Sequence, residues 1–300
     1  MEHIHTIMRI NQAAILSVSL MLSPLHGAPA VHPIEVTPPF VVNDAALLSA
    51  IQRSIGKYAE TKQGPSADDL SKQIKDVPEV LDIEFPKARA NRNPDDSVYI
   101  ISSVYLCGKC EHWHAGGIAS AWALSRDGLM VTNYHVIASA KGGAMGVVGR
   151  DGKNHRVIEI LAGDKSNDIA IIRVDSDQLV PLQVGPSAPI GEHVEVISNP
   201  DRRFFSHTYG RVSRYHSRPT KDDGKSTVKM SITADYAKGS SGGPVLDSEG
   251  RIAGMVASTF SIYYDSSPDG KSKQNLQMVI KDCVPVSAIT DMFRTPSAER

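Results

Sequence analysis

Three short stretches of the sequence carry side chains that can perform nucleophilic catalysis. The first contains His135 directly after an apolar stretch, the second contains Asp168 directly before one, and the third is a glycine-rich turn, 239–243, around Ser241. A serine hydroxyl is a poor nucleophile at neutral pH, so it needs an imidazole that takes its proton and a carboxylate that orients the imidazole. The three stretches therefore predict a catalytic triad of His135, Asp168 and Ser241.

The turn around Ser241 also offers a place for the negative charge that develops when a carbonyl is attacked. Such an oxyanion needs hydrogen-bond donors aimed at it, and a glycine lets the backbone present its own N–H groups. We expect the backbone N–H groups of Gly239 and Ser241 to form this oxyanion hole. Two neighbours compete for the triad roles: Asp164 falls in the preceding turn, and Ser240 is not followed by Gly-Gly-Pro, so both are disfavoured.

The order and spacing of these stretches resemble those of the chymotrypsin-fold serine peptidases, and among them the bacterial HtrA or Deg branch. The similarity lies in a Thr-Asn-containing segment that ends at His135, an Asp-Ile-Ala strand at 168–170 and a Gly-Ser-Ser-Gly-Gly turn at 239–243. It covers about residues 97–293. Position 240 departs from the Asn or Asp of that branch. The resemblance implies a serine endopeptidase that acts on polypeptides through an acyl-enzyme and requires no cofactor. A catalytically silent peptide-binding or scaffold protein of the same fold is the alternative.

The resemblance also indicates where the substrate pocket lies. Its residues correspond to Asp235 and Tyr236, shortly before the nucleophile, and to Ser258 and Thr259 in the strand that follows. Asp235 stands where trypsin-like enzymes hold the acid that selects lysine or arginine. HtrA relatives have an apolar residue beside that position, where Tyr236 stands, and prefer small aliphatic side chains. We favour a structural, hydrogen-bonding role for Asp235, with a basic preference as the alternative.

Two regulatory features of related proteases are not expected. The sequence has no Ile-Val-Gly-Gly-type activation terminus, and too few residues follow the expected second barrel for a peptide-binding PDZ domain. The sequence does not predict the oligomeric state or the natural substrate.

A second chemical motif contains Cys107, Cys110, His112 and His114 in the expected hairpin between the first two strands. The Cys spacing suits either a small disulfide loop or half of a zinc site. Cys283 is the only other thiol, so a closed four-ligand site would need both histidines, or one histidine and Cys283. For an exported chain we favour a Cys107–Cys110 disulfide and no metal, with a metal site and free thiols as alternatives.

The composition excludes several classes of protein. The 300 residues are 41% hydrophobic and include 32 basic and 33 acidic side chains, which gives a formal net charge of −1. This balance argues against a strongly basic nucleic-acid-binding protein and against a disordered chain. We therefore expect a globular protein without a nucleic-acid partner.

The elements that must position these residues follow from patterning along the chain. Residues 1–30 contain Arg9, an apolar run of about ten residues and a small-residue site, which predicts a signal peptide, export to the bacterial periplasm or medium, and no transmembrane anchor after its removal. Residues 31–96 predict a helical extension and connector, with Asn43 and Ser66 as helix N-caps. A packing or linker role is favoured over an inhibitory prosegment.

After residue 97 the apolar period changes from 3.6 to 2, and about twelve short strands alternate with turns. The last strands of this series fall at 251–258 and 275–280, before a closing helix at 285–293. Such a pattern predicts an all-β fold, and the resemblance divides it into two six-stranded antiparallel barrels, 97–182 and 183–300, with the triad in the cleft between them.

Overall fold

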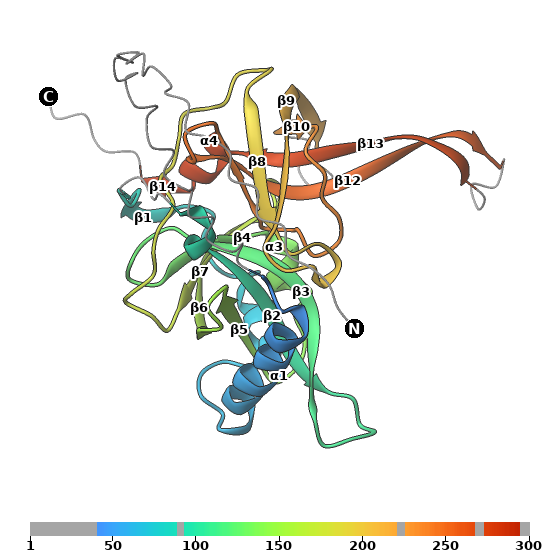
Figure 1. Cartoon of the computed structure of the whole chain (residues 1–300). Helices are drawn as coiled ribbons and strands as arrows, with labels where there is room; N and C mark the ends of the chain where they lie inside the picture. Colours follow the sequence, from blue (N-terminus) through green and yellow to red (C-terminus); the bar gives the residue numbers. More distant parts are fainter. Residues whose placement is uncertain (1–40, 89–92, 221–225, 268–272, 295–300) are drawn as a thin grey trace, which may run out of the picture. The chain divides into compact units, whose positions relative to one another are not determined.

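The computed structural model describes residues 41–88, 93–220, 226–267 and 273–294. The expected signal peptide, 1–30, lies outside these residues. In the described part of the chain, the strands form two closed barrels of six strands each (Figure 1). The all-β class with two six-stranded antiparallel barrels is therefore confirmed.

The first barrel runs in the order β2-β3-β4-β7-β6-β5 and the second in the order β10-β13-β12-β11-β8-β9. The strands of the first barrel are β2 (Val98–Leu106), β3 (Trp113–Ala123), β4 (Leu129–Thr132), β5 (Ala144–Gly149), β6 (Asn154–Asp164) and β7 (Ile169–Val174). Those of the second are β8 (His193–Ser198), β9 (Ser206–Pro219), β10 (Ser226–Ile232), β11 (Pro244–Leu246), β12 (Ile252–Ser266) and β13 (Lys273–Pro285). All twelve predicted strands are present, four of them (β2, β4, β7 and β8) with the predicted bounds and the others with shifted ends.

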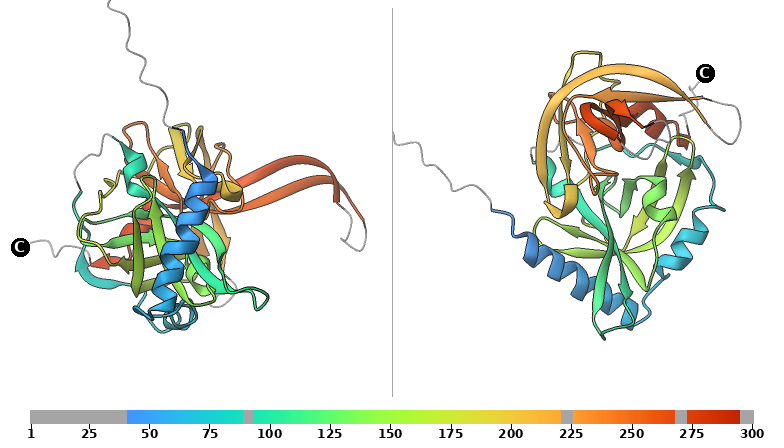
Figure 2. Two further views of the ribbon diagram at one scale, coloured as in Figure 1. Left: turned by 60° about the horizontal axis from the view of Figure 1, so that its bottom comes forward. Right: turned by 90° about the vertical axis from the view of Figure 1, so that its right-hand side faces the viewer.

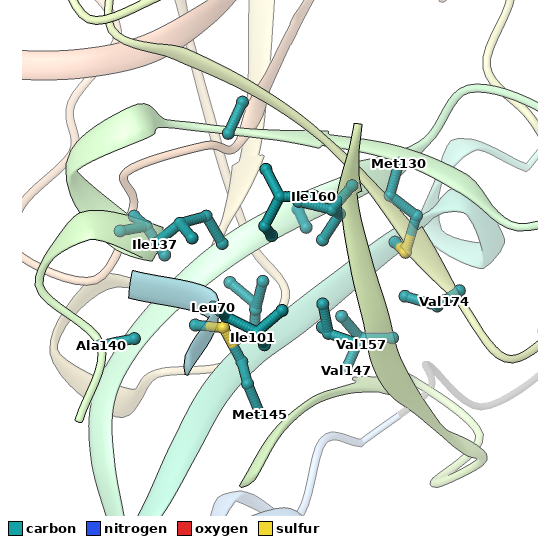
Figure 3. Close-up of a cluster of buried hydrophobic side chains, with 14 of the residues drawn as sticks. Leu70, Ile101, Met130, Ile137, Ala140, Met145, Val147, Val157, Ile160 and Val174 are labelled. Carbon is teal, nitrogen blue, oxygen red and sulfur yellow. The ribbon is translucent and has the colours of Figure 1, made fainter. Parts of the chain in front are cut away.

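Strand β7 shows how the sequence builds both the interior of a barrel and the contact between barrels. Its alternate side chains Ala170, Ile172 and Val174 join the core of the first barrel. Val174 is labelled among these core side chains in Figure 3. Ile169 and Ile171, whose side chains alternate with these, belong to a second buried cluster that includes side chains of β8, β11, β12 and β13. Successive side chains of a strand point to opposite faces. An almost uninterrupted apolar strand is therefore needed where one barrel packs on the other.

The N-terminal extension contains two helices, α1 (Asp44–Glu60) and α2 (Ala67–Gln73), which begin at the predicted caps. Asn43 accepts a hydrogen bond from the backbone of Ala46, and Ser66 forms a capping box with Asp69. The apolar face of α1 packs on side chains of the first barrel, along which it lies in Figure 2. The extension is a packing element of that barrel.

Several short elements complete the described chain. They are the 3-10 turns η1 (Pro94–Ser97) and η2 (Pro200–Arg202), the helices α3 (Tyr134–Ala138) and α4 (Val286–Thr290), and the strands β1 (Leu81–Glu84) and β14 (Phe293–Arg294). Strands β1 and β14 pair in parallel, and neither was predicted. The expected closing helix ends early because the chain turns at its end into β14.

The hairpin of β12 and β13 extends well beyond the second barrel (Figures 1 and 2). Strand β13 pairs with β10 only at residues 281–283, so the outer parts of β12 and β13 pair only with each other in the described chain. The sequence predicted both strands, but it placed their ends near the barrel.

Candidate active site

His135 lies in the first turn of α3, the short helix that follows strand β4 of the first barrel. Asn133, two residues before His135, is fully buried. Its Nδ2 atom donates to the backbone oxygen of Asp168 at 2.9 Å. This bond ties the start of α3 to the loop that carries the carboxylate. The imidazole itself is half exposed, so a substrate can reach it.

Asp168 lies at the end of the β6–β7 loop and has a φ of +69°. Only a few per cent of residues other than glycine adopt this left-handed region, so the loop must be held in place by its surroundings. Asp164 does part of this, because its carboxylate accepts from Asn167 N at 2.8 Å and from Asn167 Nδ2 at 2.6 Å. The competing carboxylate thus supports the loop, and Asp168 is the one that faces the histidine.

The three triad candidates meet in one chain of hydrogen bonds. The Nδ1 atom of His135 lies 2.8 Å from Oδ2 of Asp168, whose Oδ1 also accepts the backbone N–H of His135 at 2.9 Å. On the other side of the ring, Nε2 lies 3.1 Å from Oγ of Ser241. Ser240 is fully buried, and its hydroxyl instead accepts from Ser198 at 2.9 Å. The structure therefore brings Ser241, and not Ser240, to the imidazole.

Two glycines of the nucleophile turn are required by their surroundings. Gly239 has a φ of +99°, and a Cβ there would lie 2.4 Å from the backbone oxygen of Asn199. Gly242 has a φ of +84°, and a Cβ there would lie 2.1 Å from the backbone oxygen of Ser120. Both values are far below van der Waals contact. Among the described residues, no acceptor is recorded for the backbone N–H of Gly239 or Ser241, so both donors are available to a ligand.

A polar network that the sequence analysis did not identify fixes this turn against the first barrel. Ser120 of β3 donates from its backbone to the oxygen of Ser241 at 2.8 Å and from Oγ to the oxygen of Gly239 at 3.1 Å. Its hydroxyl accepts in return from N and Nδ2 of Asn199, which follows β8. Ser120 and Asn199 are both fully buried. The turn around Ser241 in the second barrel is thus hydrogen-bonded to strand β3 of the first barrel.

Lys229 is a second residue that the sequence analysis missed. This β10 side chain is 5% exposed, and its Nζ donates to the backbone oxygen of Asn167 at 3.0 Å. Burial lowers the pKa of Lys229, while the nearby negative charges of Asp168 and Asp164 oppose that shift. A cation of the second barrel therefore holds the peptide that precedes Asp168, the candidate triad carboxylate of the first barrel.

Comparisons with known proteins agree with this geometry. A family model described as a trypsin-like peptidase domain matches residues 119–255. The chain is 30% identical over 151 residues to chloroplastic protease Do-like 1 of Arabidopsis thaliana, covering 48% of this chain and 34% of that one. It is 25% identical over 179 residues to the serine endoprotease DegS of Haemophilus influenzae, covering 59% and 49%. The chain is a relative of the HtrA-type serine peptidases. It thus spans about a third to a half of the length of these two relatives.

Solved structures show the same fold at lower sequence identity. The active form of the Rv3671c protease of M. tuberculosis superimposes with a TM-score of 0.51 at 21% identity, covering 72% of this chain and 89% of that one. A variant of the HtrA-type protease AlgW with a tripeptide gives 0.50 at 20% identity, covering 66% and 58%. A relative of unassigned activity, protein y4bJ of Sinorhizobium fredii, is 30% identical over 170 residues, which is 56% of this chain and 26% of that one. The two solved structures therefore support the chymotrypsin-like double barrel as the fold of this chain.

The predicted pocket residues of the HtrA-type domain lie in different environments. The Asp235 carboxylate is exposed and accepts from Nζ of Lys281 at 2.5 Å. The Tyr236 ring belongs to the core of the second barrel, and its hydroxyl lies 3.0 Å from the backbone oxygen of Ser258 and 2.9 Å from that of Asp282. Ser258 and Thr259 are exposed on β12. The side chains of Ser258 and Thr259 are thus open to a ligand, whereas Tyr236 supports the strand from inside.

A cavity of about 240 Å³ lies beside the nucleophile turn. Its lining consists of Gly116, Gly117, Ile118, Asp201, Arg202, Lys238 and Gly239. The charged side chains of this lining are two basic ones, Arg202 and Lys238, and one acidic one, Asp201.

No helix among the described residues is both long and apolar enough to cross a membrane.

The cysteines of the domain are thiols in this structure. Cys107 and Cys110 are exposed at the tip of the β2–β3 hairpin, with sulfur atoms 3.5 Å apart, well beyond the length of a disulfide bond. The expected Cys107–Cys110 bond is therefore not formed here. Cys283 is fully buried in the core of the second barrel, where it cannot join a site on the hairpin.

Proposed function

We propose that the protein is a serine endopeptidase in which Ser241 is the nucleophile, His135 the general base and then acid, and Asp168 the group that orients the imidazole. The observation that carries this proposal is the continuous chain of hydrogen bonds from the Asp168 carboxylate through His135 to the Ser241 hydroxyl, with distances of 2.8 and 3.1 Å. Both distances are within the reach that proton transfer requires.

The reaction begins when Oγ of Ser241 attacks the carbonyl carbon of a peptide bond and its proton passes to Nε2 of His135. The carbonyl oxygen becomes an oxyanion, which the backbone N–H groups of Gly239 and Ser241 stabilise. The intermediate collapses when His135 gives the proton to the leaving amine, and an acyl-enzyme remains. Water then gives a proton to Nε2 of His135 and attacks the acyl-enzyme. The second intermediate collapses when His135 gives that proton to Oγ of Ser241, which frees the carboxylic acid and restores the serine.

The pairing of Asp235 with Lys281 supports a preference for substrates with an uncharged side chain at the cleaved bond. A basic substrate side chain would need an unpaired acid, and Asp235 already has Lys281 as its partner. We therefore expect small uncharged side chains to be preferred. In Asp235→Ala, the ratio of the kcat/KM values for alanyl and lysyl peptides should stay within about threefold of the ratio for the parent protein. A rise of an order of magnitude in the preference for alanyl peptides would assign Asp235 to basic selection.

The place of action that we propose is outside the cytoplasm. Probable periplasmic DegP-like serine endoproteases are among the relatives, one of them at 27% identity over 146 residues. The pattern of residues 1–30 supports a signal peptide that would direct this chain to the same kind of compartment. Its substrates would then be exported polypeptides.

Labelling with a fluorophosphonate probe tests the catalytic assignment directly. Purified full chain should form one adduct, which peptide mass mapping places on Ser241. Ser241→Ala should form none, whereas Ser240→Ala should still be labelled at Ser241 and should retain casein hydrolysis. Folded protein that is not labelled would instead support the silent peptide-binding role.

A further inference from the structure

The tip of the β2–β3 hairpin gathers three side chains that ligate metals and that the proposed peptidase mechanism does not use. The sulfur atoms of Cys107 and Cys110 are 3.5 Å apart, and the Cys110 sulfur is 3.1 Å from Nε2 of His114. All three potential ligand atoms lie within 4.8 Å of one another. They converge on one point although they come from two different strand ends and the turn between them.

These separations can be compared with the two structures that such residues form. Tetrahedral zinc, with bonds of about 2.3 Å to sulfur and about 2.0 Å to nitrogen, sets its ligands about 3.8 Å apart for S···S and about 3.5 Å apart for S···N. The Cys107–Cys110 and Cys110–His114 separations are within a few tenths of an ångström of these values. A disulfide would require the two sulfur atoms to approach each other to about 2.05 Å. The arrangement is therefore much closer to a set of zinc ligands than to a disulfide.

The backbone around the two cysteines supports the same arrangement. Gly108 has a φ of +73°, which allows the tight turn between the cysteines. The backbone N–H of Lys109 donates to the sulfur of Cys107 at 3.4 Å. A donor aimed at sulfur stabilises the thiolate, which is the form that binds a metal.

The imidazole is positioned by strand pairing. His114 of β3 is the register partner of Tyr105 of β2, and the two rings lie 5.6 Å apart between centroids. This pairing directs Nε2 toward the cysteines. His112 lies outside the cluster and instead lines a cavity of about 560 Å³ together with residues of α1.

We propose that Cys107, Cys110 and His114 bind one zinc ion, with the fourth position open to water or to a further donor. Two thiolates and an imidazole suit Zn²⁺ among the common divalent ions, and the same set suits Cu⁺. The ion would fix the hairpin tip next to Trp113, whose indole N–H donates to Glu60 of α1 at 3.0 Å. Zinc would thus stiffen the surface on which the N-terminal extension packs.

The test uses the reduced, metal-free full chain and a chromophoric chelator that competes for zinc. We expect one Zn²⁺ per chain, protection of two thiols from alkylation, and a change in the fluorescence of Trp113. Cys110→Ser and His114→Gln should each weaken the affinity by more than the 10-fold to 100-fold that loss of an outer-shell partner typically costs. Cobalt should show thiolate charge-transfer absorption, and Cys110→Ser should reduce it.

His112→Gln is the matched control, because it removes an exposed histidine of the same turn that is not part of the cluster; its affinity should stay within about twofold of the parent. Each of three results would overturn the proposal. The reduced chain could take up no Zn²⁺, the Cys107→Ser/Cys110→Ser double variant could bind as tightly as the parent, or the chain could retain Cu⁺ but not Zn²⁺. Circular dichroism of every variant checks that the barrels remain folded.

Discussion

The cleft and the hairpin tip each bring three reactive side chains together, but the two regions are built differently. In the cleft, His135, Asp168 and Ser241 come from three separate segments, which are helix α3, the β6–β7 loop and the turn before β11, and buried residues of both barrels support these segments. At the hairpin tip, all three side chains come from eight consecutive residues, and both cysteines are exposed. The cleft is therefore preorganised without a ligand, whereas the two cysteines of the hairpin tip are exposed to solvent. Substitutions should affect the two regions to very different extents.

Gly239→Ala, in the cleft, should produce the largest effect. Its Cβ would lie 2.4 Å from the backbone oxygen of Asn199, so the turn must move and carry an oxyanion donor out of place. Loss of one such donor typically lowers kcat by about 10² to 10³. Steady-state kinetics on a peptide ester measures this.

Gly117→Ala provides the control for this substitution. Gly117 lines the cavity beside the turn, but nothing lies within 4 Å of a Cβ added there. Its kcat should stay within about twofold of the parent. Equal losses in both variants would mean that the nucleophile turn is not preorganised.

Lys229→Met should lower kcat by about tenfold and leave KM nearly unchanged. The substitution removes the donor that holds the oxygen of Asn167, next to Asp168, and a hydrogen bond from a charged group is worth about 1.5 to 3 kcal/mol. Lys281→Met is a matched control, because Lys281 is also a buried lysine of the second barrel but pairs with Asp235. The rate of fluorophosphonate labelling per folded molecule separates a positioning effect from a loss of folded protein. Equal rates in both variants would show that Lys229 has no such effect.

Much of the fold and of the candidate active site could be predicted from the sequence, because local sequence patterns encode these features. Period-2 apolar stretches gave the barrel strands, polar caps gave α1 and α2, and the chemistry of the three residue types gave the members of the cleft. The pairing of β1 with β14 could not be predicted, because it joins Leu81 to Phe293 and neither segment carries a pattern of its own. The burial of Lys229 was hidden for a related reason. Its Nζ bonds to the backbone oxygen of Asn167 in the first barrel, and no local pattern indicates this contact between segments far apart in the sequence.

The contact of the connector with the second barrel should respond to pH. His207 of β9 bonds through Nε2 to Asp95 at 2.7 Å and through Nδ1 to Glu195 at 2.6 Å. These two bonds raise the pKa of His207 to about 9. Since the folded chain holds this proton more tightly than the unfolded chain, the stabilisation is complete below about pH 6.5 and is lost as the pH rises through about 9.

The size of this effect on the free energy of unfolding is at most about 3 kcal/mol from the pKa change. The His207 side chain is one-third exposed, and screening by solvent reduces the effect to about 1 kcal/mol. Urea unfolding at pH 7 and pH 10 measures the difference. His207→Gln should abolish this part of the pH dependence, and an unchanged dependence in that variant would assign it to other groups.

The smallest effect is expected at the hairpin in metal-free, reduced protein, and it completes the comparison with the cleft. Cys107→Ser and Cys110→Ser change exposed side chains, and surface substitutions usually alter stability by less than about 0.5 kcal/mol. Both variants should therefore keep the kcat and the unfolding midpoint of the parent when no zinc is present. With zinc added, the midpoint of the parent should rise while those of the variants stay constant, because an ion that binds only the folded state stabilises that state. A loss of kcat in the metal-free variants would show that the hairpin, despite its exposure, is coupled to the cleft.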